Sequence, residues 1–167
     1  KGEWIDLEPA NFRGALGQTV AAGRWNFDGP IDFHLSLENG SLPELLDVSE
    51  IQNDTVQGDC KVVIDVGGTT DRVIADAQLS SEVISYQHHA LGEMNLNAHL
   101  DGRELRMRGA VVAGLEGDMS LRMGDRWPME FSLRAEQFQA APLFGLSSDE
   151  LPIALNGNVR VTGELLF

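Results

Sequence analysis

The feature that most constrains this chain is a strict alternation of apolar and polar residues between Glu93 and Ala135. Apolar side chains fall at even positions from Met94 to Leu100 and at odd positions from Leu105 onward. A period of two is typical of a β-strand with one buried face, because successive strand side chains point to opposite sides. We therefore expect a meander of four antiparallel strands with one continuous apolar face.

The pair Asp101-Gly102 predicts the first turn of this meander. An Asp-Gly pair between alternating apolar residues indicates a two-residue hairpin, because a type I′ turn needs positive φ at both central positions. This turn would set Leu100 opposite Arg103 and Ala98 opposite Leu105, so that apolar residues meet apolar residues.

The next two connections are predicted to keep the odd-numbered residues on the same face. A three-residue loop at Glu116-Gly117-Asp118 preserves this parity, whereas a two-residue turn there would reverse it. A turn around Asp125-Arg126-Trp127-Pro128 follows. The resulting pairs are Leu115 with Met119 and Leu121 with Phe131.

Other segments repeat the strand pattern, and glycine-containing turns separate them. The strands are expected around Trp25–Phe27, Phe33–Leu37, Val62–Val66 and Val73–Leu79, with turns at Asp28-Gly29-Pro30, Glu38-Asn39-Gly40 and Gly67–Thr70. Only two brief segments read as helical, Leu42–Asp47 and Ala140–Leu146. The sequence therefore predicts an all-β fold: an elongated, curved antiparallel sheet with one or two short helical turns.

Charge and cysteine content exclude several classes of protein. The net charge is −14, which argues against nucleic acid, whose binding depends on Lys and Arg. The one cysteine, Cys60, has no partner for an internal disulfide and is expected to be a small apolar strand residue. No apolar stretch reaches the length of a membrane-spanning helix. Because the sequence begins at Lys1 and ends within a predicted strand, we expect residues 1–167 to be a segment of a longer chain.

The sequence predicts no enzyme. A nucleophile elbow, a phosphate-binding loop and a calcium-binding loop are all absent. His88 and His89 are adjacent in a predicted strand and point to opposite faces, so both cannot easily bind one metal ion. We expect no catalytic residue, no cofactor and no metal site.

The predicted apolar face has two interpretations. It is rich in Met, Leu, Val and Ala and poor in the aromatic residues that usually fill a β-sandwich core. It could pack against a second sheet as a dry core, or it could line an open trough that holds acyl chains. Under the second interpretation the lining residues are Met94, Leu96, Ala98, Leu100, Leu105, Met107, Val111, Ala113, Leu115, Met119, Leu121, Met123, Phe131, Leu133 and Ala135.

A faint internal repeat is present. Asp32-Phe33-His34-Leu35 and Glu130-Phe131-Ser132-Leu133 match at an offset of 98 residues, and a proline-containing helical candidate follows each. If the repeat is real, the single groove segment contains two related units, about 23–114 and an incomplete 115–167.

The stretches Met129–Leu165 and Val73–Met123 resemble the recurring unit of the AsmA-like superfamily, the TamB-like proteins in particular. In that unit an amphipathic strand ends in a short helical turn, and Gly-marked apolar strands follow. The resemblance covers the chain from about Gly23 onward. It implies a sheet folded lengthwise into an apolar groove, called a β-taco, in a periplasmic protein tethered to the inner membrane of a Gram-negative bacterium.

The resemblance also implies a function and partners. Such proteins carry phospholipids between the inner and outer membranes, and a TamA-like outer-membrane barrel is a partner of some of them. The expected ligands are therefore phospholipid acyl chains. The alternative is an assembly scaffold whose sheet edges accept strands of outer-membrane β-barrel proteins; a carbohydrate-active β enzyme ranks last, because Trp and Tyr are few. Open edges also predict end-to-end self-association of this segment.

Overall fold

The computed structural model describes residues 4–48, 55–124, 126–144, 146 and 149–165. Two short helical segments, α1 (Leu42–Val48) and the 3-10 turn η1 (Ala141–Phe144), interrupt a series of strands. The strands are β1 (Trp4–Gly14), β2 (Gly17–Asn26), β3 (Ile31–Ser41), β4 (Val56–Gln57), β5 (Asp59–Thr69), β6 (Arg72–Tyr86), β7 (His89–Asp101), β8 (Glu104–Val112), β9 (Leu115–Arg122), β10 (Trp127–Gln139) and β11 (Ala154–Leu165).

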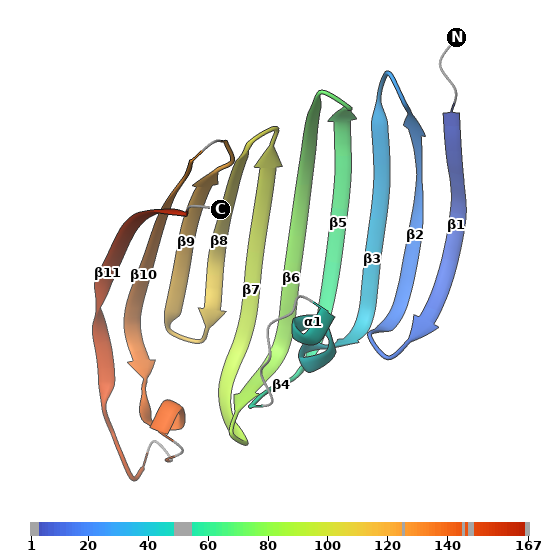
Figure 1. Ribbon diagram of the computed structural model, residues 1–167. Coiled ribbons are helices and arrows are strands. Elements are labelled where there is room, and N and C mark those ends of the chain that lie inside the picture. Colours follow the sequence, from blue (N-terminus) through green and yellow to red (C-terminus); the bar gives the residue numbers. More distant parts are fainter. Residues whose placement is uncertain (1–3, 49–54, 125, 145, 147–148, 166–167) are drawn as a thin grey trace.

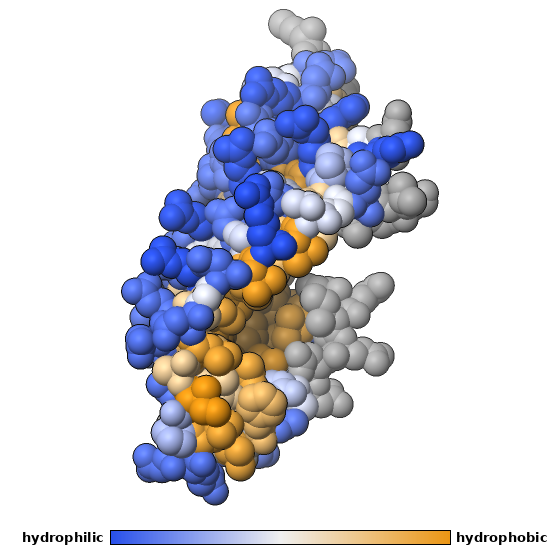
Figure 2. Space-filling model, turned by 90° about the vertical axis from the view of Figure 1, so that its left-hand side faces the viewer, coloured by the Kyte–Doolittle hydropathy of each residue, from blue (hydrophilic) through white to orange (hydrophobic). Residues whose placement is uncertain are grey.

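All eleven strands belong to one open antiparallel sheet. Its order is β1-β2-β3-β5-β6-β7-β8-β9-β10-β11, and the short β4 pairs with β6. Figure 1 shows β1 and β11 at opposite ends of this sheet, and Figure 2 shows that the sheet is bent, with apolar residues on its concave side. The predicted all-β fold, a curved antiparallel sheet with an apolar groove and short helical turns, is confirmed.

Apolar residues align in rows that run across the sheet, perpendicular to the strands. In the middle row each residue lies directly opposite the next across nine strands. The middle row is Ala21, Leu35, Ile64, Ala77, Ala98, Met107, Met119, Phe131 and Val161; the upper row is Gly23, Phe33, Val66, Ala75, Leu100, Leu105, Leu121, Met129 and Gly163; the lower row is Thr19, Leu37, Val62, Leu79, Leu96, Gly109, Gly117, Leu133 and Val159.

Four strands are bulged at the same height, just below the lower row. The register shifts lie at 37–40 in β3, 81–84 in β6, 110–112 in β8 and 135–138 in β10. A bulge inserts an extra residue, bends its strand and increases the local twist. Because these bulges lie in one line, they bend neighbouring strands together, and we call this line the crease.

The buried core follows the crease. Strand residues Leu37, Cys60 and Ile84 are 3–4% exposed, and Met94, Val112 and Phe138 are 5–7% exposed. Leu42 of α1 and Ala140, next to η1, complete the same cluster. The bend brings side chains on either side of the crease together, and the two helical segments cover them on the concave side.

Two glycines allow the β8–β9 turn to fit between its neighbours. A Cβ on Gly92, whose φ is 100°, would lie 2.7 Å from the Cβ of Ala113. A Cβ on Gly114, whose φ is 78°, would lie 2.8 Å from the carbonyl oxygen of Glu136. Only glycine tolerates both the positive φ and the close approach.

The predicted register of the β7–β8 hairpin was wrong by two residues. Asp101 pairs with Glu104 and Ala98 pairs with Met107, so the turn residues are Gly102 and Arg103. Arg72 explains the difference, because its guanidinium holds Asp101 as a strand residue with contacts of 2.7 Å to Oδ1 and 2.6 Å to Oδ2. The shift is an even number of residues, so the apolar face is unchanged.

The loop predicted at Glu116-Gly117-Asp118 was also wrong. These residues lie within β9, and the turn is the two-residue Ala113-Gly114. The bulge between Ala110 and Val112 restores the parity that this turn reverses, so a bulge replaces the expected third loop residue. In the next hairpin Met129, rather than Phe131, lies opposite Leu121.

The predicted helical segments are confirmed at Leu42–Val48 and, as a 3-10 turn, at Ala141–Phe144. The turn predicted at Glu38-Asn39-Gly40 is instead the β3 bulge, where Asn39 has a φ of 51°.

Gln137 has a φ of 52° in the β10 bulge, at the 98-residue offset of the sequence repeat. The order of a bulged strand, a helical turn and another strand therefore occurs twice in the described residues. The boundary suggested at 114/115 falls inside the β8–β9 turn of one unbroken sheet.

Replacement of Phe138 by alanine tests the contribution of the crease to stability. Phe138 is 5% exposed, and truncation of a buried Phe typically costs about 3 kcal/mol. We expect the free energy of unfolding, measured by urea denaturation, to fall by about that amount. Phe144→Ala is the matched control, because Phe144 is 70% exposed. Equal losses in the two variants would contradict a core centred on the crease.

The Arg72–Asp101 pair predicts a pH dependence. The hydrogen bond from Arg72 is the main reason that the pKa of Asp101 is lowered. A lowered pKa means that the pair's stabilisation is complete above the unfolded pKa of the carboxyl and is lost as the pH falls through the folded pKa. Carboxyl NMR titration of Arg72→Gln should show a higher Asp101 pKa, whereas Arg24→Gln, which removes a separate pair with Asp32, should leave it unchanged.

Candidate functional site

The candidate site is the part of the concave face above the crease, formed by the upper, middle and lower rows; we call it the open face. From Ala21 to Phe131 the middle-row side chains are half-buried, and Val161 is exposed. Within the described residues there is one sheet, and no large side chain is fully buried. In the part of the chain that the structure describes, no second sheet covers this face. Nothing there supports the interpretation of a dry core between two sheets.

Most residues predicted to line a groove lie on the open face. The rows contain Leu96, Ala98, Leu100, Leu105, Met107, Met119, Leu121, Phe131 and Leu133. Met94 belongs to the buried core, and Leu115 and Ala135 pack against it. Val111 adjoins the lower row, because its Cγ2 lies 3.0 Å from the position of a Cβ on Gly117.

Two further predicted lining residues, Ala113 and Met123, lie away from both the rows and the core. Ala113 is exposed in the β8–β9 turn, because the turn was placed incorrectly from the sequence. Met123 is half-buried just beyond the end of β9, where its N–H donates to the carbonyl of Arg103 at 2.7 Å.

The N-terminal half of the chain contributes to the open face as much as the meander does. The apolar lining residues that the sequence analysis did not assign are Ala21, Phe33, Leu35, Leu37, Val62, Ile64, Val66, Ala75, Ala77, Leu79, Met129, Val159 and Val161. Their alternation was visible. The missing information was how these segments pair with one another, because β3 and β5 are neighbours in the sheet although α1 and β4 separate them in the sequence.

A pair of glycines leaves the lower row without side chains at its centre. Gly109 and Gly117 lie opposite each other on β8 and β9, between Leu96 and Leu133. Gly109 has a φ of 149°, and a Cβ there would lie 2.0 Å from the carbonyl oxygen of Asn95. Glycine is therefore required at 109, and the row has a notch at this point.

The opposite, polar face carries paired polar side chains, both between neighbouring strands and within one strand. His34 and Asp65 are joined at 2.7 Å, as are His99 and Asp76, and Arg106 contacts Glu104 at 2.8 Å. A hollow of about 750 Å³ spans β5 to β9 on this face. It is a dip between charged side chains, of which Asp65, Asp76 and Arg106 are paired within the chain. We regard the open face as the better candidate, because its apolar residues have no such partners.

Neither face presents a metal centre in the described ranges. No group of three or more His, Cys, Asp and Glu residues there could hold a metal ion. Among the described helices, none is long and apolar enough to cross a membrane.

Cys60 lies on the crease and is 3% exposed, in agreement with its predicted role as a small apolar strand residue. Burial raises the pKa of its thiol, and the carboxylate of Asp59 raises it further. We expect native Cys60 to react slowly with a thiol reagent and to react rapidly once the chain is unfolded in urea. Exposed Glu82→Cys is the control and should react at once. Equal native rates for both thiols would contradict the buried placement.

Comparison with protein-family models, curated protein sequences and solved structures found no match for this chain.

Proposed function

We propose that this chain holds phospholipid acyl chains on its open face, as a segment of an AsmA-like, TamB-like bridge for lipid transport. The observation that carries the proposal is the middle row: apolar residues directly opposite one another across nine strands, most of them half-buried. The role is one of binding and passage rather than catalysis.

The length of the row fits this role. Neighbouring strands are about 4.8 Å apart, so nine strands give a row of about 38 Å. The hydrocarbon core of a bilayer, which holds two leaflets of acyl chains, is about 30 Å thick. A lipid tail therefore covers only part of the row, and successive positions along it offer a similar environment.

The composition of the row favours movement over tight binding. Burial of apolar surface contributes about 25 cal/mol per Å², whichever part of the row a tail covers. The three rows contain no charged residue, and Thr19 is their one polar member. Met107 and Met119 lie opposite each other at the centre, and flexible thioether side chains adapt to ligands of different shape.

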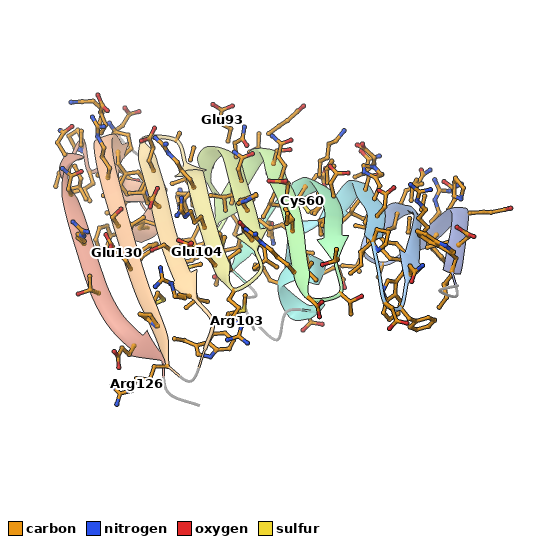
Figure 3. The ribbon with its side chains drawn as sticks, turned by 90° about the horizontal axis from the view of Figure 1, so that it is seen from above. Cys60, Glu93, Arg103, Glu104, Arg126 and Glu130 are labelled. Carbon is orange, nitrogen blue, oxygen red and sulfur yellow. The ribbon has the colours of Figure 1, made fainter. Side chains whose placement is uncertain are left out.

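The polar headgroups of bound lipids would remain at the rim. Arg103 and Arg126 extend from the β7–β8 and β9–β10 connections, on the side of the sheet where α1 lies (Figure 3). Guanidinium groups suit the phosphates of lipid headgroups. Lipid tails would then lie on the open face below these side chains.

A charge on the open face should block lipid binding. We expect Leu121→Asp and Met107→Arg to reduce crosslinking to a photoactivatable phospholipid at least tenfold, because an ionised group is unfavourable among acyl chains. Arg122→Glu is the control, since Arg122 lies opposite Glu104 on the polar face. Circular dichroism checks the fold of each variant, and equal crosslinking in folded variants of both faces would sink the proposal.

The proposal includes a location. From the resemblance we infer a protein in the periplasm, tethered to the inner membrane, with phospholipid moving toward the outer membrane. Lipid extraction after purification is the first check, since a groove that carries phospholipid should retain some of it.

The open edge of β11 favours the assembly scaffold as a second candidate. Its described side chains, residues 154–164, are all exposed. An exposed edge can accept a strand of a client β-barrel protein, with a TamA-like barrel as the receiving partner. Binding of barrel-derived strand peptides by a chain that binds no phospholipid would favour this role over transport.

A further inference from the structure

The open face is closed at one border and open at the other. Along the crease, the buried side chains of Met94, Val112 and Phe138 fill the space, and α1 and η1 cover them. The opposite border is the rim, where the β7–β8 and β9–β10 connections lie, and neither of these helical segments reaches it (Figure 1). A bound lipid can therefore keep its headgroup in water at the rim while its tails point toward the crease.

Two tryptophans lie at the rim. Trp25 follows Gly23 of the upper row by two residues, and Trp127 precedes Met129 of that row by two, so both share the side of the open face. Both side chains are partly buried. Tryptophan suits the boundary between an apolar layer and water, because its ring is apolar and its N–H is polar. The rim therefore has the side chains expected where acyl chains meet headgroups.

Arg103 provides a cation at the rim. Its side chain is exposed and lies on the side of the sheet where α1 lies (Figure 3). The nearest acidic residues in the sequence, Asp101 and Glu104, contact Arg72 and Arg106 instead. No ion pair joins Arg103 to a described residue. Because a guanidinium group fits the oxygens of a phosphate, Arg103 is suited to bind a phosphodiester.

The notch in the lower row lies on the same two strands as Arg103. Within the three rows, Gly109 and Gly117 are the only glycines that lie directly opposite each other. Between Arg103 and the notch, the open face of β8 and β9 consists of two apolar pairs, Leu105 with Leu121 and Met107 with Met119. We call this strip of the open face, from Arg103 to the two glycines, the column.

The length of the column matches the length of a phospholipid. Gly109 is six residues beyond Arg103, which is about 20 Å along a strand. Half of a bilayer, including its headgroup region, is also about 20 Å thick. A lipid with its phosphate at Arg103 would therefore have its tail ends at the notch, between Leu96 and Leu133.

We propose that the column holds a phospholipid in one orientation, with the phosphate on Arg103 and the tail ends in the notch at Gly109 and Gly117. This inference rests on the proposed function and adds to it an orientation and a headgroup contact. The tails run parallel to the strands and cross the three rows. The ligand class is a glycerophospholipid with tails about as long as one leaflet of a bilayer.

Photoreactive lipids test the orientation in the wild-type chain. One phosphatidylglycerol carries a diazirine at the end of a tail, and a second carries it on the headgroup. Mass spectrometry should find the tail-end label on Leu96 or Leu133 and the headgroup label on Arg103 or Met123, whose backbones are joined by a hydrogen bond. Tail-end labels at the rim would overturn the orientation, although they would still agree with acyl chains on the open face.

A side chain in the notch should change the preferred tail length. Gly117 has no positive φ, and a Cβ there would lie 3.0 Å from Cγ2 of Val111, so a larger residue requires only a small shift of that side chain. For Gly117→Leu we expect binding of dipalmitoyl phosphatidylglycerol, measured by native mass spectrometry, to fall at least fivefold, and binding of the shorter dilauroyl lipid to persist. Ser120→Leu, on the polar face of β9, is the control and should change neither.

The outcomes separate this inference from the proposed function. If Gly117→Leu is folded by circular dichroism but binds both lipids as the wild type does, or loses both equally, the notch does not hold the tail ends and the inference is wrong. If the wild type binds neither lipid, the proposed function fails as well.

Removal of the charge at Arg103 tests the phosphate contact. We expect Arg103→Gln to weaken binding of dipalmitoyl phosphatidylglycerol at least fivefold and to leave binding of dipalmitoylglycerol, which has no phosphate, unchanged. Arg122→Gln is the control, because Arg122 lies on the polar face. Inorganic phosphate at millimolar concentration should not displace the lipid, since burial of the tails contributes most of the affinity. Displacement by phosphate, or an equal loss of both lipids in Arg103→Gln, would contradict the proposal.

Discussion

The alignment of four bulges on one line is the constraint on which the rest of the structure depends. A single bulge bends one strand, but bulges at the same height in β3, β6, β8 and β10 bend the sheet as a whole. The bend gives a single-layer sheet a core, because it lets Leu37, Ile84 and Phe138 reach a common cluster with α1. Above the bend the register of β2 to β11 is regular, and the middle apolar row continues across these strands without interruption.

This arrangement places the residues that stabilise the fold apart from the residues that a ligand can reach. The residues with the lowest exposure lie along the crease, where α1 and η1 cover them, whereas most residues of the rows are half-buried. A change on the rows can alter binding without removing the core. The polar face has a different role, since pairs such as His34–Asp65 and Arg72–Asp101 join neighbouring strands and set their register.

The sequence predicted the fold class, the helical segments and the sharing of one face by apolar residues, because these depend on a period of two and on local turn residues. It did not predict the hairpin registers. Asp101-Gly102 is a strong local turn signal, but the long-range contact with Arg72 moves the turn by one residue. The β8–β9 loop was misplaced because a three-residue loop and a two-residue turn with a bulge keep the same residues on one face. The roles of Gly92 and Gly114 depend on contacts with other strands, which the sequence does not show.

The recurrence of a bulged strand followed by a helical turn has a consequence for size. Asn39 and Gln137 are 98 residues apart in sequence and six steps apart across the sheet, from β3 to β10, a distance of about 29 Å at the usual strand spacing. Insertion of another such unit would lengthen the apolar groove by a fixed increment without changing its width. Span would then be set by copy number, so a protein of this design could be matched to gaps of different width by duplication alone.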